Sequence, residues 1–207
     1  MKCCGLLGRL ALLSLVALAL FSGFVQPARA ATGCSGQSLT HPFLPWLDLA
    51  YYTPAPNGGL ESGASAWSLS GGAAVVPGNE PFYVTADGDS HSLALPSGSS
   101  ATTSTTCVQT LDPTMRFFVT NSGSPLSLLE VDVLYTDLFG VRRTTPIALL
   151  AGTARWVPTL PTAFLANLLY PPLLTDGKVD VEFRFTPLGS WSGWRIDDVY
   201  VDPFKGS

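Results

Sequence analysis

The feature that most constrains the fold is a strict alternation of apolar and polar residues over short stretches. Residues 129–135 alternate in this way, and so do residues 115–119 and 179–185. Successive side chains of a β-strand point to opposite faces, so each stretch is predicted to be a strand with one face on a core and the other in solvent.

Further short strands follow from the same reasoning and from frequent turn residues. The chain has 20 Gly and 17 Pro, and only 13% of its residues are charged. Further candidate strands are residues 47–52, 64–70, 73–76, 82–85, 91–95, 103–108, 143–149 and 193–201. Roughly ten short strands separated by turns predict an all-β fold, a two-sheet antiparallel β-sandwich. Residues 163–169 are the one candidate for a short helix, and an apolar strand is the alternative there.

The first 30 residues have the features of a secretory signal peptide. Lys2 and Arg9 precede an apolar run at residues 10–24, and Ala28-Arg29-Ala30 provides a small-x-small cleavage site. The run is shorter than the roughly 20 residues that a transmembrane helix needs. We therefore predict a secreted protein without a transmembrane segment, whose single β-sandwich domain spans residues 31–207.

The charge of this domain argues against two classes of partner. Without the signal peptide the chain has 8 basic and 15 acidic residues, a formal charge of −7. Such a chain repels the phosphate backbone of nucleic acids and anionic lipid surfaces. Nucleic-acid binding and electrostatic membrane docking are therefore not expected.

Two cysteines remain after removal of the signal peptide, Cys34 and Cys107. An even number of cysteines in an oxidising compartment predicts a disulfide between them. The alternative is a lipid anchor at Cys34, because residues 31–34 have the small-small-Cys ending of a bacterial lipoprotein signal. That alternative would leave Cys107 without a partner.

Two motifs carry a resemblance to a known family. Residues 57–63 read Asn-Gly-Gly-Leu-Glu-Ser-Gly and are followed by Trp67, and residues 194–200 read Trp-Arg-Ile-Asp-Asp-Val-Tyr. Together they resemble the opening and closing strands of galactose-binding-like jelly rolls, which include xylan- and glucan-binding modules, and the whole chain resembles secreted bacterial proteins of this plan. The resemblance implies jelly-roll topology and a carbohydrate-binding-like domain.

The same resemblance implies a structural calcium ion between Glu61 and Asp198. The closing motif adds a local observation, because its apolar face shifts by one residue at Asp198 and so predicts a β-bulge. A carboxylate turned inward there needs a cation or several hydrogen-bond donors. The alternative without an ion is that Glu61 caps backbone amides and that Asp198 pairs with Arg195 or Arg184.

We find no catalytic motif and predict a protein that is not an enzyme. Ser90 and His91 are neighbours, and in a strand their side chains would point to opposite faces, too far apart to act as nucleophile and base. A minor alternative is a glycoside hydrolase or lyase that uses carboxylates of the predicted strands. For these carboxylates we expect cross-strand pairing with basic residues instead; they are Glu130, Asp132, Asp180 and Glu182.

The predicted function is non-catalytic binding of a glycan. Sugar rings stack on exposed aromatic side chains, and polar groups beside them meet the hydroxyls. The candidate contacts are Trp191, in a Gly- and Ser-rich loop, and Tyr52 and Tyr170, beside Pro-rich turns. The alternative is an extracellular surface or matrix protein that docks another protein through an exposed apolar patch.

Overall fold

The computed structural model describes residue 34 and residues 36–109, 113–137, 139–164 and 178–203. The described residues all belong to one compact unit, Gly33–Ser207. The predicted signal peptide and Tyr170 lie outside the described residues.

One antiparallel sheet has the strand order β10-β7-β13-β4-β3, with β1 paired to β13 and β11 paired to β7. The strands of this seven-stranded sheet are β1 (Thr53–Pro54), β3 (Ala74–Pro77), β4 (His91–Pro96), β7 (Thr114–Asn121), β10 (Val157–Pro158), β11 (Thr162–Ala163) and β13 (Gly193–Asp202). The first strand, β1, thus lies beside the last strand, β13.

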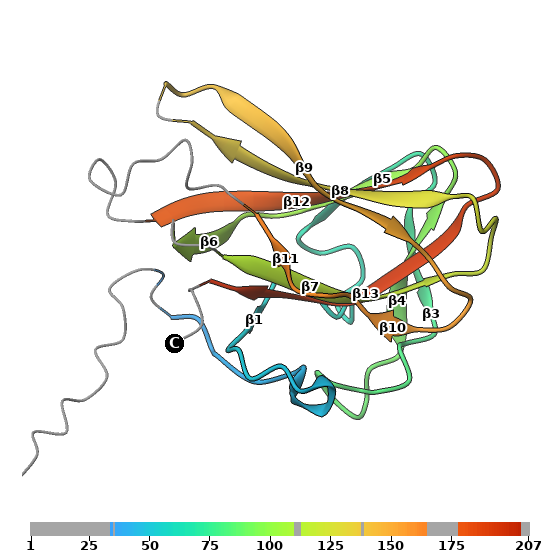
Figure 1. Cartoon of the computed structure of the whole chain (residues 1–207), viewed down its shortest axis with the longest axis horizontal. Coiled ribbons are helices and arrows are strands. Elements are labelled where there is room, and N and C mark those ends of the chain that lie inside the picture. The colour runs from blue at the N-terminus through green and yellow to red at the C-terminus, as the bar shows by residue number, and fades with distance from the viewer. Residues whose placement is uncertain (1–33, 35, 110–112, 138, 165–177, 204–207) are drawn as a thin grey trace, which may run out of the picture. The chain divides into compact units, whose positions relative to one another are not determined.

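The second antiparallel sheet has the strand order β2-β5-β12-β8-β9, with β6 also paired to β12. The strands of this six-stranded sheet are β2 (Trp67–Ser70), β5 (Ser100–Thr103), β6 (Thr106–Gln109), β8 (Leu128–Thr136), β9 (Arg142–Ala151) and β12 (Lys178–Leu188). The two sheets form the two layers seen in Figure 1. The predicted all-β sandwich with jelly-roll topology is confirmed.

The main core lies between the two sheets and is built by the alternation seen in the sequence. In β12 the side chains of Val181, Phe183 and Phe185 are buried, and the residues between them are more exposed. The ring of Phe117, from the other sheet, lies 5.2 Å from that of Phe185, edge to face. Burying each such side chain contributes about 1.5–3 kcal/mol.

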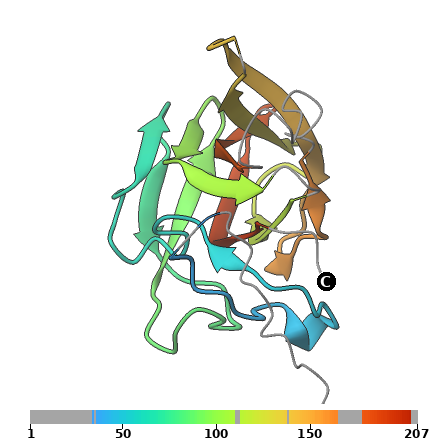
Figure 2. The ribbon, with the colours of Figure 1, turned by 90° about the vertical axis from the view of Figure 1, so that its left-hand side faces the viewer.

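A second apolar cluster lies on the outer side of the seven-stranded sheet. It contains Phe118 of β7 and Tyr200 of β13, covered by Phe43 and Tyr52. In Figures 1 and 2 the segment that supplies the cover, coloured blue, lies below this sheet. The segment includes the short 3-10 helix η2 (Leu44–Trp46).

Two predicted strands, 47–52 and 82–85, are not strands in the structure. In the first, Leu47 adopts a φ of 61°, and only Tyr52 forms a bridge, with Thr40. In the second, the carboxylate of Glu80 accepts hydrogen bonds from the amides of Phe82 and Val84. Side chains therefore satisfy backbone groups that a strand partner would otherwise bind. In the ambiguous stretch 163–169, Ala163 ends β11, and residues 165–169 lie outside the described residues.

The predicted disulfide joins Cys34 to Cys107, with 5.6 Å between the two Cα atoms. It links the N-terminal segment to β6 of the six-stranded sheet. Since Cys34 is bonded to Cys107, the structure favours the disulfide over the lipid-anchor alternative.

Candidate functional site

The opening motif forms a loop that is organised by one side chain. The amide nitrogen of Asn57 donates to the carbonyls of Gly63 and Ser65, each at 2.8 Å. The indole N–H of Trp67 donates to the carbonyl of Asn57 at 3.0 Å. Asn57 has a φ of 51°, a left-handed conformation that Asn tolerates better than most residues. The motif is thus a structural loop.

This loop pairs with the closing motif, as the resemblance implied. The amide of Ala55 donates to the carbonyl of Val199 at 2.8 Å, and the amide of Val199 donates to the carbonyl of Gly58 at 3.2 Å. A Cβ atom at Gly58 would lie 2.5 Å from the Val199 carbonyl oxygen. The close approach of the two backbones therefore requires glycine at this position.

The predicted bulge in the closing strand is confirmed. The register between β13 and β7 shifts between Asp197 and Tyr200, and Asp198 adopts a φ of 48°. Asp198 is turned inward and is 1% exposed. One carboxylate oxygen, Oδ1, accepts a hydrogen bond from the Thr85 hydroxyl at 2.7 Å. The other, Oδ2, is buried and accepts no hydrogen bond from a donor group in the described part of the chain. Burial raises the pKa of Asp198, and a side-chain hydrogen bond between the Asp198 and Glu80 carboxyl groups, which requires a proton on one of them, contributes to the rise.

Three other carboxylates lie around Asp198: Asp197 and Glu80 are buried, and Asp89 is half-buried. Asp197 accepts hydrogen bonds from the amides of Glu80, at 3.1 Å, and of Asp198, at 2.9 Å. Burial and the charge of Asp198 raise the pKa of Asp197 to about 9. Burial and the charges of Glu80 and Asp89 raise the pKa of Asp198 to about 7. We call these four residues the carboxylate cluster, and its charge must be neutralised by protons or by a cation.

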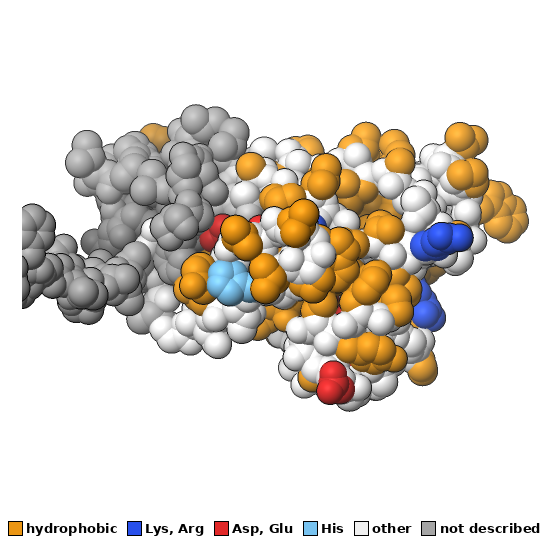
Figure 3. All heavy atoms as spheres, turned by 60° about the horizontal axis from the view of Figure 1, so that its bottom comes forward, with side chains coloured by type: hydrophobic (Ala, Val, Ile, Leu, Met, Phe, Trp, Pro, Cys, Tyr) orange, Lys and Arg blue, Asp and Glu red, His pale blue; other side chains and the backbone are white. Residues whose placement is uncertain are grey.

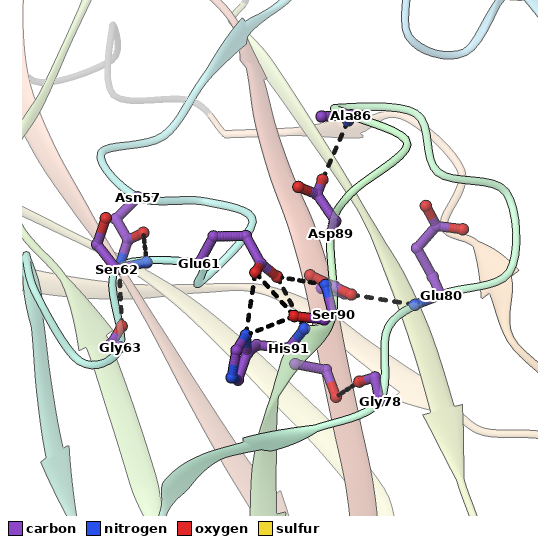
Figure 4. Close-up of polar contacts among 12 residues, drawn as sticks. Asn57, Glu61, Ser62, Gly63, Gly78, Glu80, Ala86, Asp89, Ser90 and His91 are labelled. Carbon is purple, nitrogen blue, oxygen red and sulfur yellow. Dashed lines mark hydrogen bonds and ion pairs between the residues drawn. The ribbon is translucent and has the colours of Figure 1, made fainter.

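Glu61, the other predicted calcium ligand, makes its contacts elsewhere. Oε1 accepts hydrogen bonds from the amides of Ser90, at 2.8 Å, and His91, at 2.7 Å. Oε2 lies 3.2 Å from the Ser90 hydroxyl and 3.0 Å from Nδ1 of His91 (Figure 4). Burial alone would raise the pKa of Glu61, but the hydrogen bonds from His91 and Ser90 outweigh it and lower the pKa to about 2. Glu61 thus caps the start of β4, as the alternative without an ion predicted. The other part of that alternative is wrong, because Asp198 forms no ion pair with Arg195 or Arg184 in the structure as described.

The expected separation of Ser90 and His91 is wrong. The Ser90 hydroxyl lies 3.1 Å from Nδ1 of His91. Ser90 precedes β4, which begins at His91, so the rule that alternate side chains point to opposite faces does not apply to this pair. Both Ser90 and Glu61 approach the same ring nitrogen, whereas a catalytic triad places the nucleophile and the acid on different nitrogens.

Of the two residues that the resemblance gives as calcium ligands, Asp198 suits the ion and Glu61 does not. Across the described ranges, no group of three or more His, Cys, Asp or Glu side chains is arranged to hold a metal ion. The unpartnered Oδ2 of Asp198 nevertheless needs a proton or a cation, and hard carboxylate oxygens suit calcium. Asp198 therefore fits the implied ion. Glu61 does not, because both of its oxygens already accept hydrogen bonds from Ser90 and His91.

The outer face of the six-stranded sheet carries two hollows. The first, which we call the Glu130 hollow, has a volume of about 330 Å³ and is lined by Gly98, Ser99, Ser100, Glu130, Arg184 and Thr186. The second, the Asp180 hollow, has a volume of about 420 Å³ and is lined by Thr105, Leu134, Tyr135, Thr136, Arg142, Lys178, Val179, Asp180 and Glu182. Both are lined mainly by polar side chains.

Two of the four carboxylates on this face are paired. Asp132 lies directly opposite Arg184 in the β8–β12 register and binds its guanidinium. Glu182 binds Arg142 of β9. These pairs match the expected cross-strand charge pairing. Glu130 and Asp180 have no ion pair among the residues that the structure describes.

Trp191 is the exposed aromatic residue that the glycan prediction needs. Its side chain is 85% exposed, and its φ is 59°. The next residue, Ser192, donates its amide to the hydroxyl of Ser97 at 2.7 Å. Ser97 directly precedes Gly98, which lines the Glu130 hollow. The loop of Trp191 thus lies at the end of the sheet that holds this hollow.

Tyr52 does not lie where the glycan prediction placed it. It is 1% exposed, within the second apolar cluster, and its hydroxyl donates to Asp48 at 2.8 Å. Its ring is therefore closed to a sugar. The third predicted contact, Tyr170, lies outside the described residues.

The sequence did not reveal two features of the structure. The first is the buried residue Glu80, whose backbone amide donates to the carboxylate of Asp197, 117 positions away in the chain. The second is a surface patch of large apolar side chains on the N-terminal segment and on the loop before β4. Figure 3 shows hydrophobic side chains gathered on a face of the molecule. We call the exposed large apolar side chains of these two segments the apolar surface; they are Leu39, Leu44, Leu47, Leu49, Tyr51, Phe82 and Tyr83. The alternation of residues in 44–52 could have indicated the apolar surface, because it places the Leu side chains of this segment on the solvent side.

No protein-family model matches the chain, and no curated protein matches it. Among solved structures, the chain is similar to the CBM22-1 and GH10 modules of endo-1,4-beta-D-xylanase 10B from Clostridium thermocellum, complexed with xylohexaose. The TM-score is 0.51 and the identity is 13%, over 70% of this chain and 28% of that longer chain.

Two further similar structures are carbohydrate-binding modules. A xylan-binding domain from CBM 22 has a TM-score of 0.48 and 17% identity, over 75% of this chain and 96% of that one. TmCBM61, in complex with beta-1,4-galactotriose, has a TM-score of 0.41 and 19% identity, over 70% and 94% of the two chains. At these identities the likeness concerns the fold alone.

In the described residues, no helix has the length and apolar character needed to cross a membrane.

Proposed function

We propose that the protein is a secreted, non-catalytic domain that binds a glycan on the outer face of its six-stranded sheet. The observation that carries the proposal is the Glu130 hollow, together with the loop of the exposed Trp191, which is hydrogen-bonded through Ser192 to Ser97, next to the hollow. The xylohexaose and galactotriose complexes of similar folds make a glycan the first ligand class to test. Secretion rests on the signal peptide predicted at residues 1–30.

The chemistry of this end of the sheet suits a sugar. An indole face stacks on the apolar face of a pyranose ring, and carboxylate, guanidinium and hydroxyl groups bind the sugar hydroxyls. Trp191 supplies the first kind of group, and Glu130, Arg184 and Ser100 supply the second. The pairing of Ser90 and Glu61 on one nitrogen of His91 supports a role without catalysis.

A glycan array probed with the mature protein tests this proposal. We expect binding to at least one glycan, and we expect Trp191→Ala to weaken it at least about tenfold. Burying a large apolar side chain contributes about 1.5–3 kcal/mol, and about 1.4 kcal/mol corresponds to a tenfold change in affinity. Leu160→Ala is the matched control, because Leu160 is 82% exposed and follows β10 of the other sheet. Absence of binding to any glycan, or equal loss in the two variants, would contradict the proposal.

We also propose a calcium ion at the seam between the opening loop and β13, with Asp198 as a ligand. The support is the unpartnered Oδ2 of Asp198 within the carboxylate cluster. Glu61 was the other implied ligand, but its two oxygens meet four hydrogen-bond donors. Both oxygens of Glu80 accept backbone hydrogen bonds as well, whereas among the described residues only one oxygen of Asp89 does, so Asp89 is the more available second carboxylate. Bound calcium would neutralise the cluster and raise stability by mass action.

Melting with calcium and with a chelator tests the ion. We expect a higher Tm with millimolar calcium, and we expect Asp198→Asn to abolish the difference. Asp87→Asn is the matched control, because Asp87 is an exposed acid on the loop before β4, which also carries Glu80 and Asp89. An identical Tm with calcium and with chelator would rule out a structural ion.

The apolar surface favours a second candidate function, docking of a protein, and the first partner to test is a second copy of this chain. A two-fold contact would bury the same patch on both copies, including Leu47, which is 90% exposed. Each copy carries a net negative charge, so association should strengthen with added salt. Sedimentation should show a dimer that Leu47→Asp dissolves; a monomer at all salt concentrations would exclude this candidate.

A further inference from the structure

We propose that the Glu130 hollow takes a sugar that carries a free, protonated amine, so that the ligand is a cationic glycan of the amino-sugar class. This inference rests on the proposed function and names the substrate class of the same site. It follows from the distribution of charge in the hollow, from its hydroxyl groups and from the position of Trp191.

The hollow contains two charged side chains, and only one of them is neutralised. Arg184 donates from Nε and Nη2 to Oδ2 of Asp132, at 3.0 and 2.8 Å. The side chain of Asp132 is 2% exposed, so this ion pair is fixed against the sheet. Glu130 is half-buried and has no ion pair among the described residues. The hollow thus carries one uncompensated negative charge.

Hydroxyl side chains line the same hollow as this carboxylate. Thr186 lies directly opposite Glu130 in the β12–β8 register. On the far side of β12, Ser100 lines the same hollow, and its Oγ lies 2.8 Å from Oγ of Ser70. An ammonium group has three N–H donors, so it can bind the carboxylate and donate to neighbouring hydroxyl oxygens at the same time.

A charged ligand gains more here than a neutral one. Hydrogen bonds between an ammonium and a carboxylate are roughly twice as strong as those between neutral groups. The exposed indole of Trp191 at this end of the sheet attracts cations as well as sugar rings. At longer range, the excess of acidic over basic residues in the whole chain, 15 against 11, attracts a cationic polymer and repels an acidic one.

Two oligosaccharides that differ only in this amine provide the test, the β-1,4-linked hexamer of glucosamine and its fully N-acetylated form. The two hexamers are compared at about pH 6, below the range in which an amine ordinarily loses its proton. We expect titration calorimetry to show at least about tenfold tighter binding of the glucosamine hexamer, because of the charge-assisted bond. Added salt should reduce this preference.

The variant Glu130→Gln should bring the two hexamers to within about twofold of each other. Asp180→Asn is the matched control, because it removes the same charge from the neighbouring Asp180 hollow and should leave the preference intact. Equal or tighter binding of the acetylated hexamer, or an undiminished preference in Glu130→Gln, would overturn the inference and leave glycan binding standing. Failure of both hexamers to bind would overturn the inference, and a glycan array without any binding would overturn the proposed function as well.

Discussion

Single residues with unusual backbone conformations set the geometry of the seam between the opening loop and β13. Asn57 and Asp198 both adopt left-handed φ values, and Gly58 lies against the backbone of Val199. A left-handed conformation costs a residue other than glycine about 1–2 kcal/mol. The hydrogen bonds of Asn57 and the bulge at Asp198 compensate for that cost.

Replacing Gly58 by alanine tests this close approach. The added Cβ would lie 2.5 Å from the Val199 carbonyl oxygen, so the loop and β13 must separate. We expect a loss of about 1–3 kcal/mol in the free energy of unfolding, the range for overpacking. Gly88→Ala is the matched control, because a Cβ there would meet nothing within 4 Å. Equal stability of the two variants in urea would mean that the loop does not pair with β13 as described.

At the scale of elements, the bulge in β13 gathers the carboxylate cluster and makes stability depend on pH. Burial and neighbouring carboxylates raise the pKa of Asp197 to about 9 and that of Asp198 to about 7. In the unfolded chain both groups lose their protons near pH 4. Between about pH 4 and 9 the folded state therefore holds more protons, and stability falls as pH rises.

We therefore expect the free energy of unfolding, without added calcium, to decrease from pH 5 to about pH 9. Asp197→Asn removes one of the two groups and should flatten this slope, whereas Asp87→Asn, an exposed acid, should not. Urea unfolding at a series of pH values gives the slope. A stability that is constant or rises over this range would contradict the described burial of the cluster.

The sequence predicted those strands in which the alternation of apolar and polar residues matches the core and solvent faces of the folded sheet. Alternation predicted β7, β8 and β12, and the parity shift predicted the bulge at Asp198. Alternation wrongly predicted strands at residues 47–52 and 82–85, where side chains of Asp48 and Glu80 bind backbone amides.

The prediction that Tyr52 is an exposed sugar contact was also wrong, because Tyr52 packs against Phe118 and Tyr200 from distant strands. Contacts between residues far apart in the chain leave no local pattern.

At the scale of the whole molecule, the disulfide ties the N-terminal segment to the six-stranded sheet. The bonded cysteines are 73 residues apart, and closing a loop of this length stabilises a fold by about 4 kcal/mol in the chain-entropy model. We expect Cys34→Ser with Cys107→Ser to lower the free energy of unfolding in urea by about this amount. Reduction of the wild-type protein should reproduce the loss. A loss well below about 1 kcal/mol would show that the bond does not constrain the unfolded chain as assumed.

The assignment of the two faces of the sandwich is the central claim for the whole molecule. The outer face of the six-stranded sheet is polar and hollowed, and the opposite outer side is covered by an apolar cluster and bears the apolar surface. A glycan should therefore bind to the first face, beside Trp191, and leave the second face unchanged.

Hydrogen exchange of the mature protein, with and without a saturating glycan from the array, tests this assignment most directly. We predict added protection in β12, β8 and the loop 189–193, and no change in residues 39–51. Protection confined to residues 39–51 and 82–84, with none in β12, would contradict the account.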